Sequence, residues 1–363
     1  VTEKADGIRA ELFIKDGSGY LLTPKKQLID TGVKFDTTDN WVFDGEYITK
    51  NKKDENISLF MIFDVYYCGT GKQPYELPWY SKKGESRSDI IREFRDTVHF
   101  TEWQDTMRIG FKQYFEGPDK LIEKNGSFKN LSSIFKLAKK IVDKEESEGG
   151  YEYYTDGLIF LPMFLPVKGT IADDKVKSIK GTWYQNYKWK PPEENTIDFR
   201  VKFEKEEIKS KRVNKLTSFT KNKKVIKCQQ VNLYVGYDIK KDVTTDFTWK
   251  VMGYENRKQN EILFNPVSEK DSVHICNIPL TKDKLICLKD KTVVQDGQIY
   301  EMRYEPKNPF GYQWIPLRVR DDKTRPNDSH TASNVWSTIQ NPVTELNITG
   351  SLDKIDIVED KEK

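Results

Sequence analysis

VTEKADGIRAELF, residues 1–13, places a lysine and an aspartate two positions apart in a predicted strand and follows them with a glycine. Side chains alternate across a strand, so Lys4 and Asp6 share one face. One interpretation is that these charges lie on the solvent-facing side of an edge strand. The other is that Lys4 is a nucleophile. The remaining sequence has to distinguish the two.

The same two-residue spacing of charges recurs along the chain. Further pairs are Asp44 and Glu46 in FDGEYI, Lys188 and Lys190 in YKWKP, and Arg318 and Arg320 in PLRVR. Asp156 stands directly before Gly157 in YTDGLIF. Taken singly, each pair has an ordinary explanation as a solvated strand face. Their order along the chain is the stronger signal.

The composition describes a globular, weakly charged chain. A length of 363 residues favours two or three domains. Lys and Arg number 60 against 57 Asp and Glu, so any basic binding site must be local. With four cysteines, no C-x-x-C and three histidines, no zinc site is expected, and we expect reduced cysteines in a cytoplasmic protein. No apolar run of about 18 residues occurs, so no membrane partner is expected.

The pattern of expected elements changes near residues 191–195, PPEEN. Before it, strands such as ISLFMIFDVYY mix with helices expected at 88–98 and 130–143. After it, strands are expected at 196–203, 229–238, 247–254, 273–280, 298–305 and 314–320. So many strands with almost no helix predict a small closed barrel. The lysine-rich stretch 205–224 is interpreted as a mobile basic loop, with a plain solvated charge run as the alternative.

Six blocks of sequence occur in an order that carries a family resemblance. They are EKADGIR (3–9), FDGEYI (43–48), SLFMIFD (58–64), YTDGLIF (154–160), YKWKPPEENTIDF (187–199) and WIPLRVRDDKTRPN (314–327). Together they resemble the covalent nucleotidyltransferases, which comprise mRNA capping guanylyltransferases and polynucleotide ligases. KWKPPEENTIDF and RVRDDK resemble the capping versions of the fifth and sixth motifs. TASNVWSTIQNPVT (331–344) resembles the linker helix of multifunctional capping enzymes of large DNA viruses.

This resemblance implies an α+β fold in three parts. Residues 1–194 would form a nucleotidyltransferase domain of mixed antiparallel sheets with helices. Residues 195–330 would form an OB-fold barrel acting as a lid, and residues 331–363 a C-terminal helix and polar tail. The implied reaction has two steps: a lysine attacks the α-phosphate of GTP and releases pyrophosphate, and GMP then passes to the 5′-diphosphate end of RNA.

The resemblance also assigns roles to individual residues. Lys4 would be the nucleophile, and a lysine with an ordinary pKa near 10.4 needs neighbouring cations to become a neutral amine. Nucleotide contacts would come from Asp6, Gly7, Arg9, Glu46, Phe63, Lys188, Lys190, Arg318, Arg320, Asp322 and Lys323. Mg²⁺ or Mn²⁺ would be held by Glu46, Asp156 and Asp198. Phe63 would stack on the purine, and the arginines from 318 onward would close on the β- and γ-phosphates.

Two alternatives stay open at this stage. One is an ATP-dependent DNA or RNA ligase, which shares the lysine chemistry. The other is a catalytically inactive nucleic-acid-binding module of the same fold. RNA triphosphatase and methyltransferase activities are expected to lie outside residues 1–363, in fused or associated domains. A viral source would place the protein in a viral factory or virion.

Overall fold

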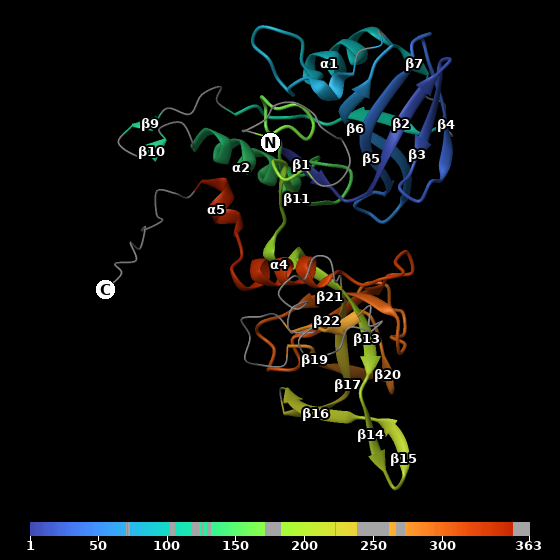
Figure 1. The fold of residues 1–363 in the computed structure, drawn as a ribbon, viewed down its shortest axis with the longest axis vertical. Helices are drawn as coiled ribbons and strands as arrows, with labels where there is room; N and C mark the ends of the chain where they lie inside the picture. Colours follow the sequence, from blue (N-terminus) through green and yellow to red (C-terminus); the bar gives the residue numbers. More distant parts are fainter. Residues whose placement is uncertain are drawn as a thin grey trace, which may run out of the picture. The chain divides into compact units, whose positions relative to one another are not determined.

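The chain divides into two compact units. The computed structural model describes residues 1–69, 71, 73–101, 106–117, 123–124, 127–128, 132–170, 183–221, 223–237, 261–265 and 273–350. One unit comprises Val1–Lys190 with Thr344–Lys363, and the other comprises Pro191–Val343 (Figure 1). Sheets dominate both units and helices are few, which confirms the predicted α+β class. None of the helices in these ranges is long and apolar enough to cross a membrane.

The first unit contains a seven-stranded sheet. Its strands are, in sheet order, β7 (Phe100–Thr101), β4 (Leu28–Phe35), β3 (Ser18–Leu22), β2 (Ile8–Lys15), β5 (Trp41–Lys50), β6 (Asn56–Tyr67) and β8 (Arg108–Phe111). Neighbouring strands are antiparallel except β6 and β8, which are parallel. Arg9 lies opposite Glu46 in this register, so two of the sequence blocks meet across β2 and β5.

Helix α1 (Arg87–Thr97) packs on this sheet, close to the range that the sequence predicts. Ser86 caps it by accepting a hydrogen bond from the Asp89 backbone N–H at 3.2 Å. The Phe94 ring of the helix lies 4.6 Å from the ring of Phe43 and 4.8 Å from that of Trp41. Phe43 and Phe94 belong to the larger core of the first unit, and Trp41 packs against it.

A second, three-stranded antiparallel sheet carries Lys4. Its order is β1 (Thr2–Ala5), β11 (Thr155–Phe160) and β12 (Tyr187–Trp189). Helix α2 (Ser132–Glu146) contacts β1, and α5 (Glu345–Thr349) contacts α2. Ile348 of α5 is buried with Ala138 and Leu158. Helix α5 therefore contributes to the core that α2 and β11 form in the first unit. A short hairpin, β9 (Glu123–Lys124) and β10 (Ser127–Phe128), also belongs to this unit.

The second unit is built on a curled eight-stranded sheet. Its main path is β20 (Lys284–Leu285), β19 (Ile275–Thr281), β17 (Lys224–Gly236), β13 (Thr196–Phe203), β21 (Ile299–Tyr304) and β22 (Trp314–Val319), with β16 (Leu216–Lys221) and β18 (Glu261–Leu263) also paired to β17. Beyond the path, the backbone N–H groups of Leu288 and Lys289 donate to the carbonyls of Pro316 and Leu317, each at 2.8 Å. These bonds join the two ends of the path.

Helix α4 (Ser329–Gln340) closes the core of the second unit. Asp328 caps the helix by accepting from the Thr331 backbone N–H at 2.9 Å. Trp336 is buried against Trp314 and Phe264, with ring centroids 5.8 and 6.1 Å apart. This division differs from the predicted scheme: α4 belongs with the barrel, whereas α5 belongs with the first unit.

Most of the strands expected after residue 195 are present. The exception is 247–254, which lies outside the described residues. The prediction of a mobile loop at 205–224 is wrong for the described residues. They form β14 (Lys205–Ile208), β15 (Lys211–Asn214), β16 and the start of β17. Lys209 and Ser210 both adopt positive φ, which gives a two-residue hairpin turn without the usual Asn-Gly signature.

Candidate active site around Lys4

One carboxylate holds two of the predicted lysines. The Lys4 ammonium donates to Oδ1 of Asp156, and Nζ of Lys190 lies 2.6 Å from Oδ2 of the same side chain. Both partners of the first contact are largely enclosed, with side-chain exposures of 20% for Lys4 and 14% for Asp156. The register between β1 and β11 shifts between Glu3 and Ala5, at the position of Lys4. In this arrangement Asp156 orients the Lys4 amine beside that of Lys190.

Further lysines surround this pair. Lys188 lies opposite Ile159 on β12. Burial lowers the pKa of Lys188, and the positive charges of Lys4 and Arg9 lower it further. Burial also lowers the pKa of Lys112, whose ammonium donates to the Glu3 carbonyl at 3.2 Å. The site therefore gathers Lys4, Lys112, Lys188 and Lys190 around the carboxylates of Asp156 and Glu3.

Glu46 and Arg9 lie on the adjoining sheet. Burial raises the pKa of Glu46, and the charges of Lys112 and Lys4 oppose that rise. Arg9 donates to both oxygens of Asp44, from Nε at 2.9 Å and from a terminal nitrogen at 2.6 Å. Because the Asp44 side chain is buried and that of Arg9 is 62% exposed, Asp44 orients a guanidinium whose far side stays accessible.

Gly7, which is predicted to contact the nucleotide, and Gly157 are both required by the packing of the chain itself. A Cβ at Gly7 would lie 2.7 Å from the Tyr47 carbonyl oxygen. Gly157 has φ +130°, and a Cβ there would lie 2.0 Å from the Trp189 carbonyl oxygen. A close approach of strands thus explains both glycines without a ligand. Asp6, between Lys4 and Gly7, is exposed, and its backbone N–H donates to the Tyr154 carbonyl at 2.9 Å.

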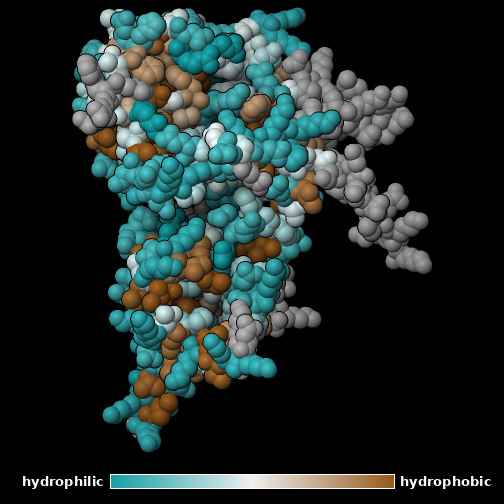
Figure 2. Space-filling model, turned by 180° about the vertical axis from the view of Figure 1, so that it is seen from behind, coloured by the Kyte–Doolittle hydropathy of each residue, from teal (hydrophilic) through white to brown (hydrophobic). Residues whose placement is uncertain are grey.

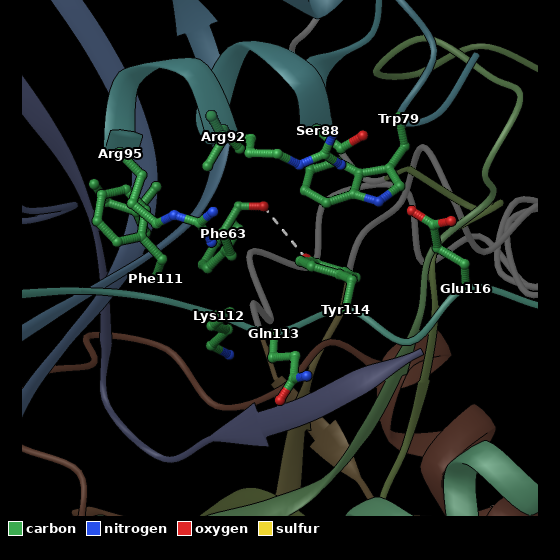
Figure 3. A pocket seen from close by; sticks show the side chains of 12 residues that line it. Phe63, Trp79, Ser88, Arg92, Arg95, Phe111, Lys112, Gln113, Tyr114 and Glu116 are labelled. Atoms are coloured by element: carbon green, nitrogen blue, oxygen red, sulfur yellow. Dashed lines mark hydrogen bonds between the residues drawn. The ribbon is translucent and has the colours of Figure 1, made fainter. Parts of the chain in front are cut away.

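An aromatic pocket of about 180 Å³ adjoins this cluster of charges (Figure 3). Phe63 lines it, and Lys112 Nζ lies 5.5 Å from the centroid of the Phe63 ring. Trp79 and Tyr114 stand beside each other with ring centroids 4.3 Å apart, and Tyr114 donates to the Phe63 carbonyl at 3.3 Å. Since Lys112 both lines the pocket and contacts Glu3, it connects the pocket to the strand of Lys4.

The remaining predicted residues form a separate cluster in the second unit. Arg320 donates from one terminal nitrogen to both oxygens of Asp198, at 3.0 and 2.9 Å, and from its other two nitrogens to Asp322 at 2.9 Å each. Lys323 also contacts Asp198, whose side chain is 6% exposed. Arg318 pairs with Glu301. The predicted metal ligand Asp198 is thus paired with two cations here.

The acidic side chains suit a metal ion that takes only one or two ligands from the protein. Within the described ranges, no group of three or more His, Cys, Asp or Glu is placed to hold an ion. Asp156 contacts Lys4, and Glu46 lies within the field of the same ammonium. Mg²⁺ commonly takes one or two protein carboxylates and completes its shell with water and substrate phosphates. Glu46 and Asp156 fit that mode of binding.

Sequence reasoning missed the buried groups beneath Lys4. Glu3 is 2% exposed and accepts from the Tyr153 hydroxyl at 2.9 Å and from the Thr2 hydroxyl at 2.7 Å. Lys112 follows β8, whose parallel pairing with β6 buries it. Because side chains alternate along a strand, the sequence could have placed Glu3 on the face of β1 opposite to that of Lys4. No local pattern marks Lys112 as a site residue.

Three comparisons relate this chain to known proteins. Residues 194–349 match the family described as the mRNA capping enzyme, C-terminal domain. The chain is 28% identical over 396 residues to a probable mRNA-capping enzyme of Acanthamoeba polyphaga mimivirus, covering 95% of this chain and 30% of that protein. It is 24% identical over 366 residues to an mRNA-capping enzyme of Caenorhabditis elegans, covering 95% of this chain and 44% of that protein.

Among solved structures, a mycobacterial DNA ligase D complexed with ATP and MES aligns over 88% of each chain, with 12% identity and a TM-score of 0.38. That likeness is too low to support an argument. The chain spans less than half the length of the mimivirus and C. elegans proteins.

Proposed function

We propose that this chain is a member of the mRNA capping enzyme family, which its similarity to such enzymes supports, and that it acts as a GTP:RNA guanylyltransferase. Lys4 Nζ attacks the α-phosphorus of GTP, a phosphorus–nitrogen bond forms, and the bond to pyrophosphate breaks. The lysine-bound GMP then passes to the terminal phosphate of 5′-diphosphate RNA. The observation that carries the proposal is the Asp156 carboxylate that orients Lys4 beside Lys190, in a cluster of further lysines.

The cluster of cations suits the first step. The attacking amine has to lose its proton before it bonds to phosphorus. Nearby cations stabilise the charge on the attacked phosphoryl group and on the leaving pyrophosphate. Lys188 and Lys190 can serve this purpose, because they lie around Lys4 rather than in a separate patch.

Glu46 and Asp156 are the residues that would hold the divalent ion in the first unit, and Asp198 is a further proposed ligand in the second. Mg²⁺ or Mn²⁺ supplies charge neutralisation at the phosphates when bound. Phe63 offers an aromatic face in a pocket of about 180 Å³, which we assign to the guanine base. Arg9, oriented by Asp44, is assigned to ribose or phosphate.

Arg320 and Lys323 are assigned to the β- and γ-phosphates, with Arg318 and Asp322 beside them. Both cations are held by Asp198 in the structure, so the triphosphate would have to compete with that carboxylate. RNA triphosphatase and methyltransferase activities, where the parent polypeptide carries them, are proposed for residues outside this chain.

Incubation with α-labelled GTP and a divalent metal tests the proposal directly. A labelled protein that survives denaturation is expected, and the label should be acid-labile and alkali-stable, as for a phosphorus–nitrogen bond. The same incubation with α-labelled ATP separates a guanylyltransferase from a ligase. Labelling by ATP but not GTP would refute the proposed nucleotide, and absence of any label would refute the covalent mechanism.

A further inference from the structure

A basic extension interrupts the barrel between β13 and β17. We call residues 205–227 the basic arm; it contains the β14–β15 hairpin, β16 and the first residues of β17. The hairpin pairs Lys205 with Asn214 and Ile208 with Lys211, so it is regular over its whole length. In Figure 1 the hairpin extends away from the curled sheet of the second unit. The arm is therefore an ordered, projecting structure.

The arm concentrates positive charge. It contains nine Lys and Arg residues and two Glu residues, a net charge of +7. The whole chain carries +3, so the other residues together carry −4. Lys211, Arg212 and Lys224 are exposed, and none of the three pairs with a carboxylate among the described residues. Because fields are screened within about 8–10 Å at physiological salt, this local excess determines what the arm attracts.

Aromatic side chains lie at the base of the arm. The Phe219 and Tyr312 rings stand 4.4 Å apart, and the Tyr312 hydroxyl donates to the Ser218 carbonyl at 3.2 Å. Phe310, two residues before Tyr312, is 56% exposed. In the β16–β17 register Phe219 lies opposite Ile226, so Lys224 shares its face of the ribbon. Cations on the same face as aromatic rings are typical of surfaces that bind single-stranded nucleic acid.

We propose that the basic arm binds the phosphate backbone of the RNA whose 5′ end is capped. The proposal rests on the proposed guanylyltransferase function and adds the binding surface for the acceptor strand. The arm also exposes Leu216 (57%) and Val225 (70%), which would suit a protein partner. Figure 2 shows hydrophobic and hydrophilic residues side by side at the projecting end of the hairpin. The net charge of +7 favours a polyanion as the occupant.

The test is RNA binding by the whole chain without GTP. The variant Lys211→Gln/Arg212→Gln/Lys224→Gln removes three exposed charges. The probe is a 3′-labelled, 5′-diphosphate oligoribonucleotide of about 15 nucleotides, near the upper site size of one OB-fold. Each lost phosphate contact on a single strand reduces the slope of log K against log salt by about 0.7. We expect the slope to become shallower by about 2, and the affinity at about 0.1 M salt to fall roughly 100-fold.

The matched control is Lys25→Gln/Lys26→Gln/Lys53→Gln, which removes three exposed lysines from the first unit. It should leave the slope unchanged. With a 5′-hydroxyl probe, the arm variant should bind more weakly than the unmodified chain by the same factor as with the 5′-diphosphate probe. The reason is that the arm contacts the RNA backbone and not the 5′ end. The arm variant should form the GMP adduct normally, and equal melting temperatures establish that both variants fold.

Two results would overturn the assignment. One is an unchanged salt slope in the arm variant, which would leave a protein partner as the occupant of this surface. The other is an equal loss of affinity in the control variant. That result would mean that RNA binding depends on the net charge of the chain and not on the position of the arm. Failure of the proposed function is distinguishable, since it appears as a missing GMP adduct while RNA binding persists.

Discussion

Arg87 is a fully buried arginine that supports the wall of the aromatic pocket. Its Nε donates to Oδ1 of Asp64 at 2.7 Å, and its side chain is 0% exposed. Asp64 follows Phe63 directly, and the Arg87 guanidinium lies 5.8 Å from the centroid of the Trp79 ring. Phe63 and Trp79 both line the pocket. We predict that Arg87→Met, which keeps most of the volume and removes the charge, destabilises the first unit.

The expected magnitude follows from the burial of both partners. Removing one member of a buried ion pair costs about 3–5 kcal/mol, because the other charge is left uncompensated. In a unit of roughly 200 residues, each kcal/mol moves the melting temperature by about 2–4 °C. The melting temperature of the first unit should therefore fall by about 6–20 °C. Scanning calorimetry measures this, with adduct formation as a second readout of pocket geometry.

The defect should depend on pH in a defined direction. Burial raises the pKa of Asp64, and Arg87 opposes that rise. A carboxyl whose folded pKa lies above its unfolded pKa contributes stability below the unfolded value, and this is lost as pH rises through the folded value. Arg87→Met removes the opposing charge, so the pKa of Asp64 rises further. The loss of melting temperature should thus be larger at about pH 8 than at about pH 5.

Two companion variants make the prediction refutable. Asp64→Asn/Arg87→Met removes both charges and should recover part of the loss. Arg92→Met, on the exposed side of the same helix, should change stability by less than about 0.5 kcal/mol. If Arg87→Met melts within about 2 °C of the unmodified chain, or if the double variant is no more stable than the single one, the buried pair does not have the role assigned to it.

Three predictions concern the chemistry and are read from α-labelled GTP on denaturing gels. Lys4→Ala and Lys4→Arg should each abolish the covalent adduct, since arginine stays protonated at any usable pH; adduct at the unmodified rate would exclude Lys4 as nucleophile. Glu46→Ala and Asp156→Ala should slow adduct formation and GMP transfer roughly 100-fold each; normal transfer from a preformed adduct would confine that carboxylate to the first step. Arg320→Ala and Lys323→Ala should block adduct formation but spare transfer, because pyrophosphate leaves only in the first step; equal loss in both steps would contradict their assignment.

Sequence patterns predicted the regular elements well and long-range burial poorly. Strands such as β6 and β13 follow from apolar runs and alternation, and α1 from its 3.6-residue period. The β14–β15 hairpin was missed because Lys209 and Ser210 form a turn that favours Gly or Asn. Lys112 was missed because its burial depends on β8 pairing with β6, about 50 residues earlier in the sequence.

The course of the chain between its two units has a mechanical consequence. The chain leaves the first unit after Lys190 and re-enters it at Thr344, where α5 packs on α2. The barrel, Pro191–Val343, is therefore inserted into the first unit, to which the chain connects it at both ends. Ending the chain at Val343 would therefore do more than shorten the polypeptide: it would remove Ile348 from the core that contains Ala138 and Leu158 and expose apolar surface in the first unit.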